Sequence, residues 1–502
     1  MNPFMSNTKY ALVYCSIRHF MSAMVLMCLL YGCMPHKYKP EPVDSNALAR
    51  QFNSWSLDNP DLIRFLLANG IGQETVNSNA FSLNRLYLTS LFYHPEMQVA
   101  YKKLRKANVV AEHSGFRTNT GISIPLEHHS ETSGGQSQWT IGAVLNFIYE
   151  RKDKREARQA EAEVGLLNAR LALDQLAVDI FGRIEMLYHN YLVSRARITE
   201  TENEIAVLKE LLDQLQGKYE LGAASQFEIS TVKLELQQRK FELSLQENIA
   251  QGLKDQLLSM TQVSHTEFSG IEIDYIHPVK FASSLYRDGS LSDSDINTLQ
   301  ARLLDSHLDL AQRLNDYARS EAVLRLEIEK QYPDIVLSPG FIFDQSDNIW
   351  TLGTSWILPF LTNTEQELHI LEALEERRIR QQEIISLQKQ LLNRLYQYYN
   401  SINRYRHSIS VSDEIVTTVE QRADELKKQI ELGGIDRIAL LRNRVEYHKA
   451  RQTQLQIYSE AINAMLEFKL LLQDSHAGVD PAHTVTLWMA NMVKINSNEP
   501  DY

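Results

Sequence analysis

The chain has 502 residues, a net charge of −12 and only 20 glycines and 13 prolines. Its length allows several domains, but so little glycine and proline favours long helices over several unrelated globular domains. The negative charge, together with the lack of a basic aromatic stripe, argues against a nucleic-acid scaffold. The sequence has one long uncharged apolar run, whereas each span of a helical polytopic membrane protein needs about 20 apolar residues, so that class is excluded.

That apolar run, residues 20–31, follows the basic residues Lys9 and Arg18. A positive segment followed by a short apolar segment is typical of a secretory signal peptide. We therefore expect residues 1–32 to be a leader that is removed from the mature chain.

The leader ends in Leu-Tyr-Gly directly before Cys33, which resembles the bacterial lipoprotein signal. The other two cysteines lie in the leader, so the mature chain would keep one cysteine without a disulfide partner. We expect a covalent diacylglycerol on Cys33 and no other cofactor. Met34 replaces the aspartate that commonly retains such lipoproteins in the inner membrane, which favours the outer membrane. A plain signal peptide or an N-terminal anchor helix is the alternative.

Residues 33–79 are polar and interrupted by prolines, which predicts a lipid-anchored, extended arm. A short helix over residues 81–93 follows. Another helix starts near Pro95, a residue that suits the first helical position, and runs to about residue 111.

The pattern then changes to the alternation typical of strands, at one place in each half of the chain. The predicted strands cover about 116–125 and 138–148, and later 334–343 and 350–360. Polar turns over 128–137 and 344–349 join each pair. Four strands cannot cover their own edges, so we expect them to contribute to a shared closed barrel.

Each strand pair is followed by a very long helix, predicted over residues 154–219 and 365–430. Neither range contains proline, and at 1.5 Å per residue each helix spans on the order of 100 Å. A globular core does not need helices of this length, so we expect a coiled coil or the stave of a barrel.

The returning helices carry apolar residues at a 3-4 spacing, which predicts two antiparallel helical hairpins. Arg239, Gln246, Asn443 and Gln454 interrupt this spacing, and we expect them to help fix the register. The apolar positions are Ile229, Val232, Leu236, Leu243, Ala250, Leu253, Leu257 and Met260 in the first half, and Leu440, Tyr447, Ala450, Ile457, Ala461, Ala464, Phe468 and Leu471 in the second.

Matching glycines indicate that the chain contains one unit twice. Gly222 corresponds to Gly433, 211 residues later, and Gly142 corresponds to Gly353 at the same offset. Two unrelated local patterns that share an offset predict a structural repeat, over residues 80–262 and 298–473.

The hairpins are predicted to turn at 222–225 and 433–436, where a glycine ends one helix and Ser225 or Asp436 is placed to cap the next. Two segments lie outside the repeats, residues 263–297 and 474–502. We place both around the waist of the helical body.

The order of a helix, two strands, a long helix, a Tyr-x-x-Gly turn and a returning helix, present twice, resembles the TolC-like outer membrane efflux protein family. The resemblance covers residues from about 81 to 472, and Cys33 makes the chain similar to the lipoprotein branch. The residues that carry it are His94, Pro95, Glu96, Gly142, Leu145, Tyr219, Gly222, Gly353, Trp356, Pro359, Phe360 and Gly433.

The resemblance implies a mainly α-helical fold with a small β part, assembled as a homotrimer. Its 12 strands would form an outer-membrane β-barrel that continues into a periplasmic α-helical tunnel. The implied function is the exit duct of a tripartite efflux or type I secretion system. An inner-membrane transporter would deliver substrate through a periplasmic adaptor protein, and the duct would conduct it passively.

The resemblance places the two helical turns at the periplasmic tip, where they would contact the adaptor. Small residues allow close contact with a helical hairpin, although they also simply suit a turn. The expected contact residues are Tyr219, Gly222, Ala223, Ala224, Ser225, Gly433, Gly434, Ile435 and Asp436.

Some family members carry an acidic ring six and nine residues after the second tip glycine. Ala439 and Arg442 hold those positions here, and Glu228 and Thr231 hold the equivalent positions of the first half. These four residues are the candidates for a tunnel constriction, but the acidic ring is absent as such.

Arg442 leaves three alternatives open. It would form a cationic constriction, pair with Asp436 or Glu446, or lie in solvent. Cation selectivity is therefore not carried over from the family.

An enzyme is not indicated, because no Gly-rich phosphate loop, zinc signature or nucleophile elbow occurs in a suitable setting. His128 and His129 lie beside Glu127 and Glu131, but on a polar turn without a defined further ligand, so we expect no metal. The tyrosines of the second long helix and their partial match in the first favour packing over a ligand site: Tyr396, Tyr398, Tyr399 and Tyr405, with Tyr188 and Tyr191.

The alternative from another class is a structural coiled-coil lipoprotein that conducts nothing. It explains the lipid and the long helices. It does not explain why a pair of strands precedes each long helix.

Overall fold

In the computed structural model, the described residues are 40, 42–46, 55–131, 134, 136–287, 296–345, 347–356, 364–473 and 481–496. The chain divides into two units, Met1–Phe52 and Asn53–Tyr502, and all elements discussed below belong to the second. The fold is mainly helical with a small sheet part, as the sequence predicts. Cys33, Pro359 and Phe360 lie outside the described residues.

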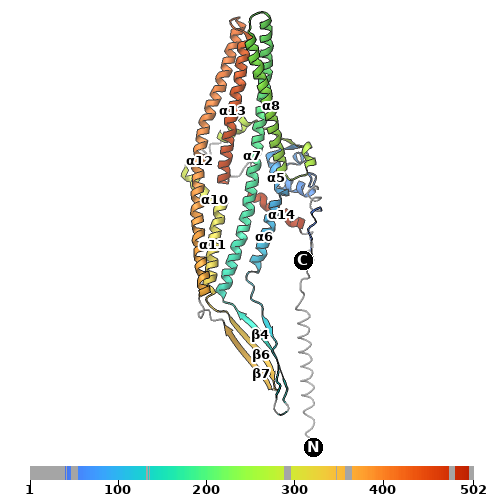
Figure 1. Cartoon of the computed structure of the whole chain (residues 1–502), viewed down its shortest axis with the longest axis vertical. Coiled ribbons are helices and arrows are strands. Elements are labelled where there is room, and N and C mark those ends of the chain that lie inside the picture. The colour runs from blue at the N-terminus through green and yellow to red at the C-terminus, as the bar shows by residue number, and fades with distance from the viewer. Residues whose placement is uncertain are drawn as a thin grey trace. The chain divides into compact units, whose positions relative to one another are not determined.

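Two hairpins of long helices form one layer of the unit (Figure 1). At 1.5 Å per residue, the 69 residues of α7 and the 68 residues of α12 each span about 100 Å. The helices α7 and α13 pack against each other, so the order across the layer is α8, α7, α13, α12. The bounds are α7 Lys152–Glu220, α8 Gln226–Met260, α12 Thr364–Glu431 and α13 Arg437–Leu472.

Two shorter helices complete the layer near the sheet, where α8 and α13 no longer run beside the long helices (Figure 1). Helix α6, Pro95–His113, packs on α7, and α11, Leu308–Glu329, packs between α7 and α12. Pro95 lies in the first turn of α6, where its missing N–H leaves no backbone acceptor unpaired.

The sheet is an antiparallel meander in which β4 pairs with both β2 and β3 on one side and with β6 on the other, while β7 pairs with β6. The bounds are β2 Gly121–Ser123, β3 Leu126–His128, β4 Trp139–Tyr149, β6 Ile335–Asp344 and β7 Asp347–Trp356.

Two details of the sheet differ from the sequence prediction. The first strand is broken between β2 and β3, because Pro125 has no N–H to donate and only accepts from the Gly142 N–H at 3.0 Å. The turn predicted over 344–349 is present but shorter, since Asp344 already pairs with Asp347 and Gln345 has φ of 46°. Residues 357–360 of the last predicted strand lie outside the described residues.

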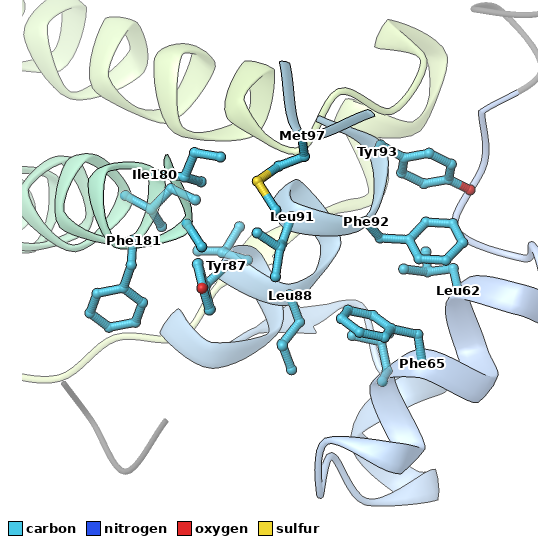
Figure 2. Packing of buried hydrophobic residues seen from close by; sticks show 14 of the residues in the cluster. Leu62, Phe65, Tyr87, Leu88, Leu91, Phe92, Tyr93, Met97, Ile180 and Phe181 are labelled. Atoms are coloured by element: carbon cyan, nitrogen blue, oxygen red, sulfur yellow. The ribbon is translucent and has the colours of Figure 1, made fainter. Parts of the chain in front are cut away.

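The waist of the unit contains the largest apolar core, which includes Leu62, Phe65, Tyr87, Met97 and Phe181 (Figure 2). It joins short elements to α7: α3 Pro60–Ala68, α4 Gln73–Val76, β1 Ala80–Phe81, α5 Leu83–Tyr93, η1 His265–Gly270, β5 Glu272–Ile273 and α14 Pro481–Asn496.

The residues around α3 differ from the extended arm that the sequence predicts. Leu62 and Phe65 lie on one face of α3 and have no exposed surface, so burial of that face holds the segment in the core. Two further helices, α9 Pro278–Arg287 and α10 Ile296–Ser306, pack against α13.

The apolar seam predicted for α8 is confirmed at five of its eight positions, which are buried: Ile229, Val232, Leu236, Ala250 and Leu257. The other three, Leu243, Leu253 and Met260, are half-buried. On α13 the prediction is only partly right. The predicted positions from Leu440 to Ile457 are half-buried, and residues close to them in the sequence are buried instead. Helix α13 packs on both α7 and α12, so its apolar stripe is wider than a single seam. The buried residues there include Leu441, Val445, Leu455, Tyr458 and Ile462.

Each polar residue that interrupts the seams has a partner on a neighbouring helix. These contacts satisfy groups that burial would otherwise leave unpaired. Arg239 Nε lies 3.0 Å from Glu204 Oε1, Thr201 Oγ1 donates to Gln246 Oε1 at 2.9 Å, Asn443 Nδ2 donates to the Val419 carbonyl at 3.1 Å, and Gln454 Nε2 donates to Asp413 Oδ1 at 2.6 Å.

Candidate functional site: a two-faced sheet and paired helical tips

The sheet has one apolar face. Alternate residues of β4 point to this face and remain exposed despite being large and hydrophobic, among them Trp139, Ile141, Leu145 and Phe147. Through the strand register, Phe147 lies opposite Leu337 on β6. On β7 the same face carries Trp350 and Leu352, which are 82% and 73% exposed. Water is a poor environment for such a face, whereas hydrocarbon suits it.

The other face carries polar residues that hydrogen-bond to one another, beside a few apolar ones such as Ile148 and Ile349. Asn146 Oδ1 accepts from Ser338 Oγ at 2.8 Å, and Asn146 Nδ2 donates to Ser123 Oγ at 2.7 Å. Thr140 Oγ1 donates to Asp344 Oδ1 at the far end of the same strands. The sheet is therefore more apolar on one face than on the other.

Both edges of the sheet end without a further strand among the described residues. The strands β2 and β3 pair only with β4, and β7 pairs only with β6. An unpaired edge presents a row of N–H and C=O groups that bind another strand. Within the described residues, the sheet thus presents a free strand edge on each side.

Aromatic residues mark the end of the sheet where it meets the helices. Tyr149, Tyr332 and Trp356 are each about half exposed or more there, and the Arg151 guanidinium lies 4.1 Å from the ring centroid of Tyr332. Aromatic rings with a polar edge collect at the boundary between lipid and water.

The two helical turns, residues 221–225 and 432–436, are called the tips here. In the first, the Ala223 N–H donates to the Lys218 carbonyl at 2.8 Å and the Gly222 N–H donates to the Tyr219 carbonyl at 2.9 Å. This is a Schellman motif, which needs a left-handed residue, and Gly222 has φ of 73°.

The second tip repeats this geometry. The Gly434 N–H donates to the Gln429 carbonyl at 2.9 Å, the Gly433 N–H donates to the Ile430 carbonyl at 3.0 Å, and Gly433 has φ of 72°. The leucine before each left-handed glycine is strongly exposed: Leu221 at 84% and Leu432 at 86%. These leucines are not among the predicted contact residues, although their matching positions before the two glycines were a usable signal.

The two predicted helix caps behave differently. Ser225 forms a capping box with Glu228, since Ser225 Oγ accepts from the Glu228 N–H at 3.2 Å and Glu228 Oε2 accepts from the Ser225 N–H at 3.1 Å. Asp436 occupies the N-cap position of α13, but its side chain accepts no capping hydrogen bond. Its carboxylate pairs with Lys218 on the other hairpin instead.

Three ion pairs join the first hairpin to the second near the tips. Besides Lys218 with Asp436, Arg437 pairs with Glu210, and Arg442 Nη2 lies 3.3 Å from Glu228 Oε1. These roles of Lys218 and Glu210 could not be predicted from the sequence, because their partners depend on how the two hairpins lie side by side.

The candidate constriction residues are brought together only in part. Arg442 pairs with Glu228 rather than with Asp436, whose carboxylate pairs with Lys218. Hydrogen bonds from Ser225 and the charge of Arg442 lower the pKa of the Glu228 carboxyl. Thr231 Oγ1 donates to the Phe227 carbonyl at 2.8 Å, and Ala439 is half-buried on α13.

The histidine pair contributes to packing in the sheet. His128 makes an edge contact with Trp139, and His129 Nε2 lies 3.0 Å from Thr140 Oγ1. Within the described residues, no group of three or more potential metal ligands comes together. Of the tyrosines, Tyr398 and Tyr399 pack on an apolar cluster with α10, as expected for a packing role.

No described helix combines the length and the hydrophobicity needed to cross a membrane. No family model matches the sequence, and no curated protein is similar enough in sequence to match.

Solved structures do match this fold. The CmeC outer membrane channel of Campylobacter jejuni has a TM-score of 0.62 at 11% identity, covering 91% of this chain and 98% of CmeC. The outer membrane protein VceC of Vibrio cholerae has a TM-score of 0.58 at 16% identity, covering 76% of this chain and 95% of VceC. The open state of the MtrE outer membrane channel of Neisseria gonorrhoeae has a TM-score of 0.57 at 11% identity, covering 78% of this chain and 89% of MtrE.

Proposed function

We propose that this chain, which has the fold of these outer-membrane channels, is a TolC-like outer membrane efflux protein and acts as the exit duct of an efflux or secretion system. The observation that carries the proposal is an open sheet with one apolar face and four strand positions, one of which is shared by the short strands β2 and β3. It is attached to two helical hairpins whose long helices span about 100 Å. The duct has no enzymatic activity of its own and conducts substrate passively.

Three copies close the sheet into a barrel of 12 strands. The free edge of β7 pairs with the β2 and β3 edge of the next copy, which leaves no edge unpaired. A strand of the length of β4, 11 residues, spans about 25 Å when it is tilted by about 40°, and this is the height of the apolar band of outer-membrane barrels. The apolar face then meets lipid and the polar face lines the lumen.

The helical layer continues the barrel as a tunnel that crosses the periplasm. Its tips meet a periplasmic adaptor protein, which receives substrate from an inner-membrane transporter. The exposed leucines Leu221 and Leu432 extend the expected contact set. The other contact residues are Tyr219, Gly222, Ala223, Ala224, Ser225, Gly433, Gly434, Ile435 and Asp436.

We further propose that Cys33 carries a diacylglycerol that anchors the mature chain in the outer membrane. Glu228, Thr231, Ala439 and Arg442 lie near the tips and are the candidate constriction. The pair of Arg442 with Glu228 makes this region close to neutral rather than cationic.

The test is electron-microscope class averaging of the detergent-extracted protein, combined with conductance in a planar bilayer. A threefold hollow cylinder with a conducting lumen is the expected result. Solid rods or monomers without conductance would leave the non-conducting coiled-coil lipoprotein as the better description.

A further inference from the structure

Helix α8 has a second apolar stripe on the side away from α7. Phe227, Leu234 and Phe241 follow one another at a spacing of seven residues, and Leu245 and Ile249 extend the stripe. These residues are 78%, 56%, 75%, 51% and 50% exposed, and no described element covers them. A heptad of large apolar residues on an edge helix requires a partner helix.

A groove lies at the opposite edge of the same helical layer. It runs between α12 and α13, has a volume of about 430 Å³, and is lined by Val411, Ile415, Ala450 and Ile457 among others. In Figure 1, α8 and α12 are on opposite sides of the hairpins, with α7 and α13 between them.

The hydroxyl groups that border the groove are already satisfied. Ser408 Oγ donates to the Arg404 carbonyl at 3.2 Å, Ser412 Oγ donates to the Ile409 carbonyl at 2.8 Å, and Thr453 Oγ1 donates to the Lys449 carbonyl at 3.1 Å. An apolar side chain can therefore fill the groove without leaving a hydroxyl unpaired.

The stripe and the groove lie at matching distances from the tips along the helices. Phe241 and Leu245 come 19 and 23 residues after Gly222, while Ile415 and Val411 come 18 and 22 residues before Gly433. The two tips are level with each other, because Lys218 pairs with Asp436 across them. The charges beside the contact are complementary, since exposed Lys240 precedes Phe241 and exposed Glu414 precedes Ile415.

We infer that Phe241 and Leu245 of one copy seat in the groove between α12 and α13 of the next copy. The inference rests on the trimeric channel proposed above and names the residues that join its staves. Such a contact joins one edge of a copy to the other edge of the next copy, so it is heterologous. Heterologous contacts form a closed ring when the rotation that relates neighbouring copies is a whole fraction of a turn. Lys240 faces Glu414 of the next copy beside the apolar contact.

Disulfide trapping in membranes tests the contact. The double variants Phe241→Cys with Ile415→Cys, and Leu245→Cys with Val411→Cys, should give two- and three-chain species on non-reducing gels after mild oxidation. A bond within one copy is excluded, because two helices separate the paired positions and a disulfide needs Cα atoms within about 7 Å. Each single cysteine variant should give no such ladder.

A matched control is Phe227→Cys with Ile415→Cys. Phe227 belongs to the same stripe, but it lies 14 residues, or about 21 Å, closer to the tip. This pair should not cross-link. Equal cross-linking of the control would overturn the inference, because it would show that the two helices meet without a fixed register.

The wild-type protein is imaged in parallel. If it is a trimer and neither double variant cross-links, the inference is wrong and the proposed channel stands. If the wild-type protein is not a trimer, both the inference and the proposed channel are wrong. As a second measurement, Phe241→Ala should lower the temperature at which the trimer dissociates in detergent, and an unchanged temperature would count against the contact.

Discussion

Glu204 on α7 has no exposed surface and is held by charged and polar neighbours from two other helices. Arg239 Nε on α8 lies 3.0 Å from Glu204 Oε1, and Gln452 Nε2 on α13 donates to Glu204 Oε2 at 3.0 Å. Burial raises the pKa of the Glu204 carboxyl, while Arg239 and Lys449 oppose that rise. The Glu204 carboxylate thus links α7, α8 and α13, and the charge of Arg239 stabilises its ionised form.

We predict that Arg239→Met destabilises the protein by about 3–5 kcal/mol at alkaline pH, because it leaves a buried carboxylate without its counter-charge. Loss of Arg239 raises the pKa of Glu204 further. The penalty therefore falls as the pH drops through that pKa and the carboxyl becomes neutral. Thermal unfolding at pH 8 and pH 5, followed by circular dichroism, measures the difference.

The control for this prediction is Lys233→Met, an exposed position on the same helix, which should change stability by less than about 0.5 kcal/mol. The double variant Arg239→Met with Glu204→Gln should recover much of the loss. An Arg239→Met penalty of equal size at both pH values would show that the ion pair is not its cause.

At the scale of elements, the tips show how two adjacent glycines differ. Gly433 has φ of 72°, which an L-residue adopts at a cost of about 1–2 kcal/mol. A Cβ on Gly434 would only make an ordinary contact with the Gln429 carbonyl at 3.5 Å.

We predict that Gly433→Val disrupts the tip and reduces export more than it reduces insertion of the barrel. The matched control is Gly217→Val, because Gly217 lies on α7 outside the contact set and a Cβ there meets nothing within 4 Å. Comparing export with the amount of trimer in the membrane separates the two effects, and normal export by Gly433→Val would refute the role of the tip.

The sheet allows a similar comparison between neighbouring residues. Leu352 lies on the apolar face of β7, and Thr351 lies on the polar face. Leu352→Lys should destabilise the inserted barrel by about 2–4 kcal/mol, as lysine does near the middle of a bilayer, while Thr351→Lys should be tolerated. Folding into lipid vesicles, detected by a gel-mobility shift, measures this. Equal effects of the two substitutions would mean that the face assignment is wrong.

The long helices could be predicted from the sequence because nothing in it interrupts them. Proline is absent from both, and the left-handed glycines Gly222 and Gly433 mark where the chain turns. The helix α3 was missed because its apolar face is short and lies among polar residues, and only the core that it joins stabilises it. The break at Pro125 was missed because strand alternation continues across it.

Contacts between elements were harder to predict than the elements themselves. The residues Arg239 and Asn443 were recognised as interruptions of a seam, but their partners lie on other helices. Likewise, the carboxylate of Asp436 binds Lys218 rather than capping its own helix, because the two hairpins bring opposite charges together. Such pairs depend on the arrangement of the hairpins, which a single sequence does not contain.

At the scale of the molecule, strands and helices follow the same order. Helix α6 leads into β2, β4 into α7, α11 into β6, and β7 towards α12. The strand order from β2 to β7 therefore repeats the helix order α6, α7, α11, α12. A neighbouring copy related by a single rotation can consequently pair with the free edge of the sheet and pack on the free side of the helices at the same time. This agreement is what a continuous barrel and tunnel require.

The last prediction concerns the lipid anchor that we propose at Cys33. A barrel that inserts by its apolar face does not need a lipid to stay in the membrane, so Cys33→Ala should abolish acyl labelling and still allow trimers to form. Growth with a radiolabelled fatty acid, followed by purification and gel analysis, gives the measurement. Cys28→Ala, within the expected leader, is the matched control and should keep the label. Labelling that persists in Cys33→Ala would exclude Cys33 as the acceptor, and loss of the trimer in that variant would show that the anchor acts in assembly rather than only in attachment.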